Sequence, residues 1–193
     1  TTEIYTLSLH DALPICFIWV NWSQGNVLSF DEKDGLKYWQ GEHAGFTRLK
    51  DPVMHKRTVL LVEMQNWFVI DHVSGLSEHE FQLNWVLDNA FKQPDIEKNI
   101  LLLEHKSQIF SAQFGLLDNI IPIDVLSADE TSIRGWVSRY YGHKVPAKSV
   151  QLTQRSNQAV FWSFFGSKNG KISSTGEGIS LQLKDWTIYL DKS

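Results

Sequence analysis

Cysteine is almost absent from this sequence, since Cys16 is the only one among 193 residues. One cysteine cannot build a disulfide framework or a paired-cysteine metal motif, so both are excluded. Long apolar runs are also missing, because none approaches the roughly 20 residues that a membrane-spanning helix needs. Neither a glycine-rich phosphate loop before a helix nor a serine nucleophile elbow occurs, which excludes two common kinds of enzyme site.

Charge of one sign is scarce as well. The sequence has 18 Lys and Arg against 22 Asp and Glu, a formal net charge of −4, and it contains no block of like charges. A nucleic acid or an anionic membrane surface would call for a concentrated basic face or tail. We therefore expect neither a nucleic acid nor a membrane to be the main partner.

The first fifteen residues, TTEIYTLSLHDALPI, differ in character from the aromatic run CFIWVNW that follows. With one choice of codons they translate a common short-read sequencing adapter, so we interpret residues 1–15 as an artefact and exclude them from the fold. Without them 178 of the 193 residues remain, and the loss of Glu3 and Asp11 brings the formal charge to −2. Residues 16–193 are enough for one domain with a sizeable core.

The remaining composition is typical of strands. Eight Trp, 11 Phe and many Val, Ile and Thr residues occur in short stretches separated by Gly, Asn, Asp and Ser, and helix signals are few. We therefore predict an all-β protein, an antiparallel β-sandwich of about a dozen strands with two sheets packed face to face. Residues 115–131 are the least strand-like and are predicted to form a long connection. The predicted strands are 17–22, 26–30, 36–43, 57–63, 67–73, 79–87, 99–105, 108–114, 150–156, 159–165, 179–183 and 186–190.

Residues 41–75, GEHAGFTRLKDPVMHKRTVLLVEMQNWFVIDHVSG, contain the densest group of candidate functional residues. In order and spacing this stretch resembles the C-terminal β-sandwich domain of heparinase II/III-like polysaccharide lyases. The later stretches SEHEFQLNW and GWVSRYYGHKVPA add to the resemblance, which covers most of residues 36–165. The family pattern has an acid where this chain has Ala44 and a tyrosine where it has Phe46.

The resemblance implies β-elimination at a uronic acid. This reaction needs the substrate carboxylate neutralised, a proton taken from the adjacent carbon and the leaving oxygen protonated, and an imidazole suits two of those tasks. By resemblance His55 is the catalytic histidine, although a lone histidine is more often structural. Arg57 shares a strand face with His55 and is a candidate for binding an anionic substrate. The alternative is an ion pair between Arg57 and Asp71 on a neighbouring strand. The other histidines nearby, including His43, are interpreted as hydrogen-bonded or exposed.

The resemblance also bears on metal binding. Other members of the family hold a zinc ion through a His-x-His motif, an aspartate and a further histidine. Here Arg57 occupies the second position of that motif, while Asp71 and His105 stand for the remaining ligands. Because a cation replaces a ligand, we expect the full zinc site to be absent. No other cofactor is implied.

Residues 136–146, WVSRYYGHKVP, form a second candidate region. Aromatic faces stack on sugar rings, and arginine binds carboxylates in a fork. Arg139, Tyr141 and His143 are therefore candidate substrate-binding residues. The alternative is that this stretch packs a corner of the sandwich, with Trp136 buried.

Two functions remain open. The first is the C-terminal part of a lyase that acts on an acidic polysaccharide, such as a glycosaminoglycan or alginate, and to which this domain donates His55. In the resembled lyases the base and the residue that grips the uronate come from an N-terminal helical toroid, which this sequence lacks, so we expect the chain alone to be inactive. The second is a non-catalytic carbohydrate-binding or supporting β-sandwich. The resemblance implies a periplasmic or secreted protein whose partners are the polysaccharide and the toroid of the same chain.

Overall fold

A computed structural model describes residues 24–88, 91, 99–105, 108–117, 119, 121–167, 171–175, 178–183 and 186–191. Within these ranges the chain forms thirteen strands, paired antiparallel, and no helix. No helix long and apolar enough to cross a membrane is therefore found in the described part. The predicted all-β antiparallel fold is confirmed. The adapter-like residues 1–15 and the predicted strand 17–22 lie outside the described residues.

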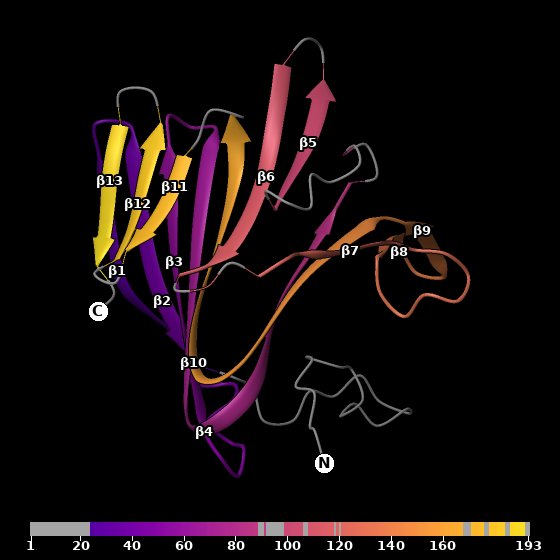
Figure 1. The fold of residues 1–193 in the computed structure, drawn as a ribbon, viewed down its shortest axis with the longest axis horizontal. Coiled ribbons are helices and arrows are strands. Elements are labelled where there is room, and N and C mark those ends of the chain that lie inside the picture. Colours follow the sequence, from indigo (N-terminus) through magenta and orange to yellow (C-terminus); the bar gives the residue numbers. More distant parts are fainter. Residues whose placement is uncertain are drawn as a thin grey trace.

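The largest sheet has eight strands in the order β1-β2-β3-β4-β10-β6-β5, with β7 also paired to β10 (Figure 1). Its strands are β1 (Gly25–Lys33), β2 (Leu36–His43), β3 (Val53–Val62), β4 (Asn66–Leu87), β5 (Ile100–His105), β6 (Gln108–Leu116), β7 (Asp124–Ser127) and β10 (Lys148–Ser167). A second sheet contains β11 (Lys171–Thr175), β12 (Gly178–Leu183) and β13 (Trp186–Asp191). A separate hairpin contains β8 (Trp136–Tyr140) and β9 (His143–Pro146).

The long strands β4 and β10 form a bent ribbon that gives the sandwich part of its second layer. Their register runs from Lys148 opposite Leu87 to Phe165 opposite Trp67, with an irregularity at residues 156–158. Near the end of β4, the Trp85 side chain donates from Nε1 to Ser163 Oγ at 2.8 Å, across 78 residues of sequence. The far half of the ribbon therefore folds back over the sheet. Figure 1 shows β4 and β10 bending together at the lower end of the view.

Two hydrophobic cores lie on opposite faces of the large sheet, because successive side chains of a strand point to opposite sides. Phe161 of β10 belongs to the first core and Phe164 to the second. The first core fills the space under the folded-back ribbon, and the second lies against β11, β12 and β13. The first core contains Val53, Phe81, Leu83, Leu87, Leu101, Ala112, Phe114, Leu116, Ile123, Val150, Leu152, Ala159 and Phe161. The second contains Leu60, Val62, Phe68, Ile70, Leu117, Phe164, Ile179, Leu181 and Leu183.

The structure differs from the predicted strands at three places. The predicted strands 67–73 and 79–87 merge into β4, and 150–156 and 159–165 merge into β10. At both junctions the β4–β10 ladder is interrupted by a shift of register, between Ser156 opposite His79 and Gln158 opposite Ser74. The predicted connection 115–131 contains β7, which pairs with Gln151 and its neighbours on β10. Pairing satisfies backbone groups that the far half of β10 would otherwise expose on that edge.

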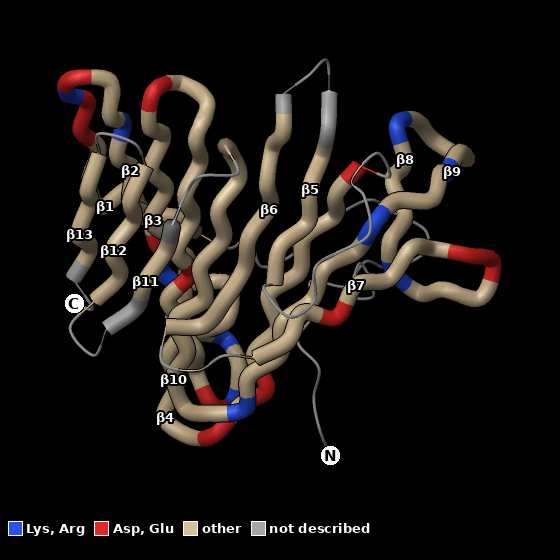
Figure 2. The backbone as a smooth tube through the Cα atoms, turned by 45° about the horizontal axis from the view of Figure 1, so that its top comes forward, with Lys and Arg blue, Asp and Glu red and all other residues tan. Residues whose placement is uncertain are grey.

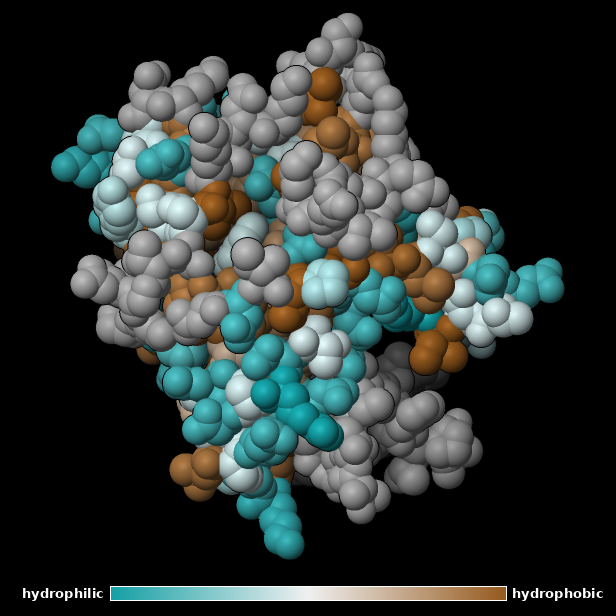
Figure 3. Space-filling model, viewed as in Figure 1, coloured by the Kyte–Doolittle hydropathy of each residue, from teal (hydrophilic) through white to brown (hydrophobic). Residues whose placement is uncertain are grey.

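Charged residues are concentrated at turns and strand ends, with both signs interspersed, as Figure 2 shows. In the space-filling view, hydrophilic residues gather over the bend of β4 and β10 (Figure 3). The β8–β9 hairpin lies on the opposite side of the molecule from β1, β2 and β3 in both Figure 1 and Figure 2. The two candidate regions of the sequence are therefore widely separated in the fold.

Candidate functional site

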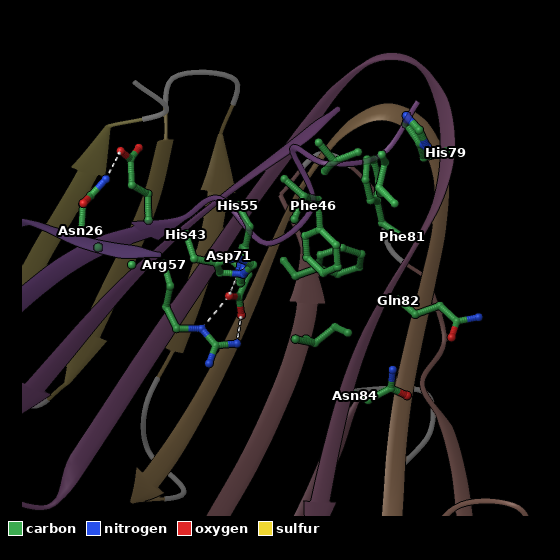
Figure 4. A pocket seen from close by; sticks show the side chains of 18 of the residues that line it. Asn26, His43, Phe46, His55, Arg57, Asp71, His79, Phe81, Gln82 and Asn84 are labelled. Carbon is green, nitrogen blue, oxygen red and sulfur yellow. Dashed lines mark hydrogen bonds and ion pairs between the residues drawn. The ribbon is translucent and has the colours of Figure 1, made fainter. Parts of the chain in front are cut away.

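Strand register brings four polar side chains together on one face of the large sheet. His43 at the end of β2 lies opposite His55 of β3, and Arg57 of β3 lies opposite Asp71 of β4. The expectation that His55 and Arg57 share a strand face is confirmed by this register. Figure 4 shows the four side chains converging from β2, β3 and β4.

His55 lies at the centre of a chain of hydrogen bonds. Its Nδ1 is 2.7 Å from Nε2 of His43, and its Nε2 is 2.6 Å from Oδ1 of Asp71. The backbone N–H of Gly45 donates to Nδ1 of His43 at 3.1 Å. Each ring nitrogen of the two histidines therefore has a hydrogen-bond partner.

Arg57 and Asp71 form a two-pronged ion pair. The guanidinium donates from Nε to Oδ1 at 2.6 Å and from Nη2 to Oδ2 at 3.0 Å. The predicted ion pair between Arg57 and Asp71 is confirmed. Two parallel N–H···O bonds are the geometry in which arginine binds a carboxylate most strongly. The Asp71 side chain is only 5% exposed, whereas that of Arg57 is 39% exposed and lies 5.8 Å from the centre of the Trp85 ring. The Arg57 side chain thus remains partly accessible to solvent.

The charges of the site follow from these contacts. Burial acts to raise the pKa of Asp71, but the hydrogen bonds and charges of His55 and Arg57 outweigh it and hold the pKa below the ordinary value of 3.8. Burial lowers the pKa of His43 below the ordinary 6.5, and the neighbouring His55 and Arg57 lower it further against the opposing charge of Asp71. At neutral pH the site thus holds a carboxylate, a guanidinium and an uncharged His43.

A hollow of about 820 Å³ opens beside the four side chains. This volume is within the range of about 300–1,000 Å³ that is usual for small-molecule sites. Its walls come from β1, β2, β3, the loop after β2 and the far half of β4, so the fold-back of the ribbon creates it (Figure 4). The polar residues that join the four in its wall are Asn26, Glu42, His79, Glu80, Gln82 and Asn84.

The loop between β2 and β3 is held in place from both ends. Phe46 packs against the first core, and its ring centre lies 5.2 Å from that of His43. Asp51 accepts a hydrogen bond from the backbone N–H of Ser77 at 3.2 Å, and its Oδ2 lies 3.1 Å from Nε2 of His79. At the position of the family's tyrosine, this chain thus places an apolar ring that supports His43.

The second predicted region is not brought to this site. Arg139, Tyr141 and His143 belong to the β8–β9 hairpin, and none of them lines the hollow. The Tyr141 side chain is 99% exposed, and the rings of Tyr140 and His143 are stacked with centres 4.5 Å apart. The role of the three residues in substrate binding stays a prediction.

The described residues do not fit a zinc ion. Both oxygens of Asp71 are engaged by Arg57, and Oδ1 also faces His55. In the described part of the chain, no three His, Cys, Asp or Glu side chains are grouped so that they could hold a metal. The side chain of His105 lies outside the described residues. We therefore derive no chemistry through a metal.

His43 is hydrogen-bonded, as interpreted from the sequence, but its place beside His55 was not predicted. The motif pointed to His55, Arg57 and Asp71, while His43 was interpreted as an ordinary histidine. The signal that could have found it is the pairing of two predicted strands, 36–43 and 57–63, across a short loop. Extending that pairing by two residues sets His43 opposite His55.

The profile of the family described as "Heparinase II/III-like, C-terminal" matches residues 6–175. The chain therefore belongs to this family, and the resemblance predicted from its motifs is confirmed. A search of curated proteins found no match.

Solved structures share the fold at low sequence identity. One heparinase III structure is 15% identical in sequence, with a TM-score of 0.65, and the match covers 86% of this chain and 27% of the heparinase III chain. A heparinase III gene product has 12% identity and a TM-score of 0.67 over the same shares. The heparan sulfate lyase HepC from Pedobacter heparinus is 14% identical, with a TM-score of 0.64, and the match covers 87% of this chain and 28% of the HepC chain. The chain thus spans little more than a quarter of these proteins.

Proposed function

We propose that this chain is the C-terminal β-sandwich domain of a polysaccharide lyase that cleaves a uronic-acid-containing polysaccharide by β-elimination. The observation that carries the proposal is the placement of His55 in the wall of the hollow, between His43 and the Arg57–Asp71 ion pair. Family membership and the titles of the solved relatives, heparinase III and heparan sulfate lyase, support the same reaction class.

The described residues suit separate parts of this reaction. The partly exposed Arg57 side chain neutralises the uronate carboxylate, which makes the proton on the neighbouring carbon easier to remove. His55 presents its imidazole to the reacting sugar, and Asp71 holds both side chains in position by its three hydrogen bonds. The remaining groups, including the one that protonates the leaving oxygen, are supplied by residues outside this chain, so the chain alone is inactive in this proposal.

The substrate class follows from charge and size. A partly exposed guanidinium in a hollow of about 820 Å³ suits a carboxylated sugar, and both glycosaminoglycans and alginate provide one. A periplasmic or secreted location belongs to the proposal, since such polysaccharides lie outside the cytoplasm.

The test is an assay of the protein encoded by the complete reading frame. Elimination leaves an unsaturated uronate whose conjugated double bond absorbs ultraviolet light. We expect this absorbance to rise with heparan sulfate or alginate and to stay flat with the same polysaccharide after chemical reduction of its carboxyl groups. A protein that binds these polysaccharides but releases no unsaturated product from any of them would instead be a carbohydrate-binding or supporting module.

A further inference from the structure

The hydrogen bonds around the two histidines fix where their protons lie. The Gly45 backbone N–H can only donate, so Nδ1 of His43 is an acceptor and carries no proton. A neutral imidazole holds one proton, which for His43 must then be on Nε2. That nitrogen is 2.7 Å from Nδ1 of His55, so the bond between the rings runs from His43 to His55.

The other end of the chain fixes the same direction. Asp71 is ionised at neutral pH, and a carboxylate accepts hydrogen bonds but donates none. Nε2 of His55 must therefore carry the proton that bridges the 2.6 Å to Asp71. His55 is then neutral, with its proton on Nε2 and a lone pair on Nδ1. No other distribution of protons satisfies Gly45, His43, His55 and Asp71 together.

We infer that His43 is a positioning residue for His55, whose Nδ1 it keeps unprotonated as a hydrogen-bond acceptor and whose Nε2–H it keeps directed at Asp71. The catalytic part of this inference rests on the proposed function, whereas the direction of the hydrogen bonds does not. A buried carboxylate beside an imidazole stabilises the doubly protonated ring. The N–H of His43 opposes that effect, since two protons cannot occupy the 2.7 Å between the rings.

In the proposed elimination the substrate takes the place of His43 at Nδ1. The bond to Asp71 is charge-assisted and buried, while the bond to His43 joins two neutral rings, so the latter opens more readily. A base outside this chain takes the proton from the carbon beside the carboxylate, and the C–H electron pair becomes the double bond. The C–O bond breaks, and the leaving oxygen takes a proton from water or a hydroxyl group outside this chain.

Nitrogen NMR of the full 193-residue chain tests the hydrogen-bond direction without any activity. Long-range ¹H–¹⁵N correlation distinguishes a ring nitrogen that carries a proton from one that does not. At neutral pH we expect both His43 and His55 to carry their proton on Nε2 alone. Protonation of Nδ1 in His55 would overturn the inference, whatever reaction the protein catalyses.

Variants separate the role of His43 from simple packing. His43→Gln offers an oxygen to Gly45 and an N–H to His55, so we expect the His55 spectrum to stay as in the parent. His43→Phe keeps a ring beside Phe46 but has no donor, and we expect Nδ1 of His55 to gain a proton. His72→Gln is the matched control, because His72 follows Asp71 on β4 but lines a smaller hollow on the opposite face. An unchanged His55 spectrum in a folded His43→Phe chain would contradict the inference, and the wild-type spectrum remains decisive if that variant does not fold.

Kinetics of the complete protein then test the catalytic part. We expect His43→Phe to lower kcat by about tenfold or more with little change in KM, and His43→Gln to recover most of the rate. A rise in KM with unchanged kcat would show instead that His43 binds the substrate. A complete protein without lyase activity would refute the proposed function, while the NMR result on the histidine pair would stand.

Discussion

Asp71 is the residue that fixes the positions of two others. It accepts hydrogen bonds from His55 and Arg57 while its side chain is 5% exposed. Asp71→Asn keeps the size but removes the charge that the guanidinium faces. Breaking a fully buried pair costs about 3–5 kcal/mol, and partial exposure of Arg57 reduces this, so we expect the free energy of unfolding to fall by about 2 kcal/mol. Urea unfolding of the chain measures it.

The matched control is Asp124→Asn. Asp124 pairs with Arg134, but the Asp124 side chain is 68% exposed, so we expect a loss below about 1 kcal/mol. Equal losses in the two variants would mean that burial of Asp71 contributes nothing to the strength of its pair.

His43 makes stability depend on pH. Because its pKa is lowered in the folded chain, the unfolded chain binds more protons just below the ordinary 6.5, and stability rises with pH through that window. The charged or titratable groups that act on it are His55 and Arg57 from β3 and Asp71 from β4. Stability contributed by His43 is therefore complete at neutral pH and is lost as the pH falls through the lowered pKa.

Melting temperatures between about pH 7.5 and pH 5 measure this dependence. We expect the chain to melt at a lower temperature on acidification and His43→Gln to show a shallower slope. A second loss, due to Asp71, begins below its ordinary pKa of 3.8 in both proteins. Parallel slopes above that point would contradict the assignment of the pH dependence to His43.

At the scale of elements, the turn between β3 and β4 depends on a close approach to β10. Asn66 is buried, donates to the Val62 carbonyl at 3.3 Å and accepts from the Ser167 backbone N–H at 3.0 Å. A Cβ on Gly166 would collide with Oδ1 of Asn66 and lie 3.1 Å from its Cα. We therefore expect Gly166→Ala to lower the free energy of unfolding by about 1–3 kcal/mol.

Gly25→Ala is the control for this substitution. Gly25 is also in a strand, but the nearest atom to an added Cβ is the Glu42 carbonyl oxygen at an ordinary 3.6 Å. We expect its stability to stay within about 0.5 kcal/mol of the parent. If Gly166→Ala is equally neutral in urea unfolding, Asn66 does not hold the turn in the way described.

Strand identity could be predicted from the sequence, but strand continuity could not. The strand 159–165 was predicted from its apolar and aromatic residues, and the structure places Phe161 and Phe164 in different cores, because successive side chains of a strand point to opposite faces. Residues 74–78 and 156–158 contain residue types that favour turns, yet β4 and β10 bend there without ending. The pairing of the two strands on both sides of the bend and the Trp85–Ser163 hydrogen bond hold them together. Similarly, His55 was found by its motif, whereas His43 depends on register across a loop.

At the scale of the whole molecule, the three-stranded sheet is held by apolar packing rather than by a shared ladder. Leu181 of β12 is fully buried in the second core, together with Phe68 and Phe164 of the large sheet. Leu181→Ala removes that packing and leaves a cavity, for which about 2–5 kcal/mol is the usual cost. We expect a loss in this range by urea unfolding, against less than about 0.5 kcal/mol for Leu76→Ala, whose side chain is 87% exposed. Similar losses in the two variants would contradict the placement of β12 over the large sheet.

The fold-back of β4 and β10, the packing of the first core and the register of β2, β3 and β4 together place His55 in the wall of the hollow. The most direct test of its role is the ultraviolet assay of the complete protein with and without His55→Ala. We predict that the variant loses at least about 100-fold in kcat while it still binds the polysaccharide. A variant that retains the rate of the parent would show that His55 takes no part in the elimination.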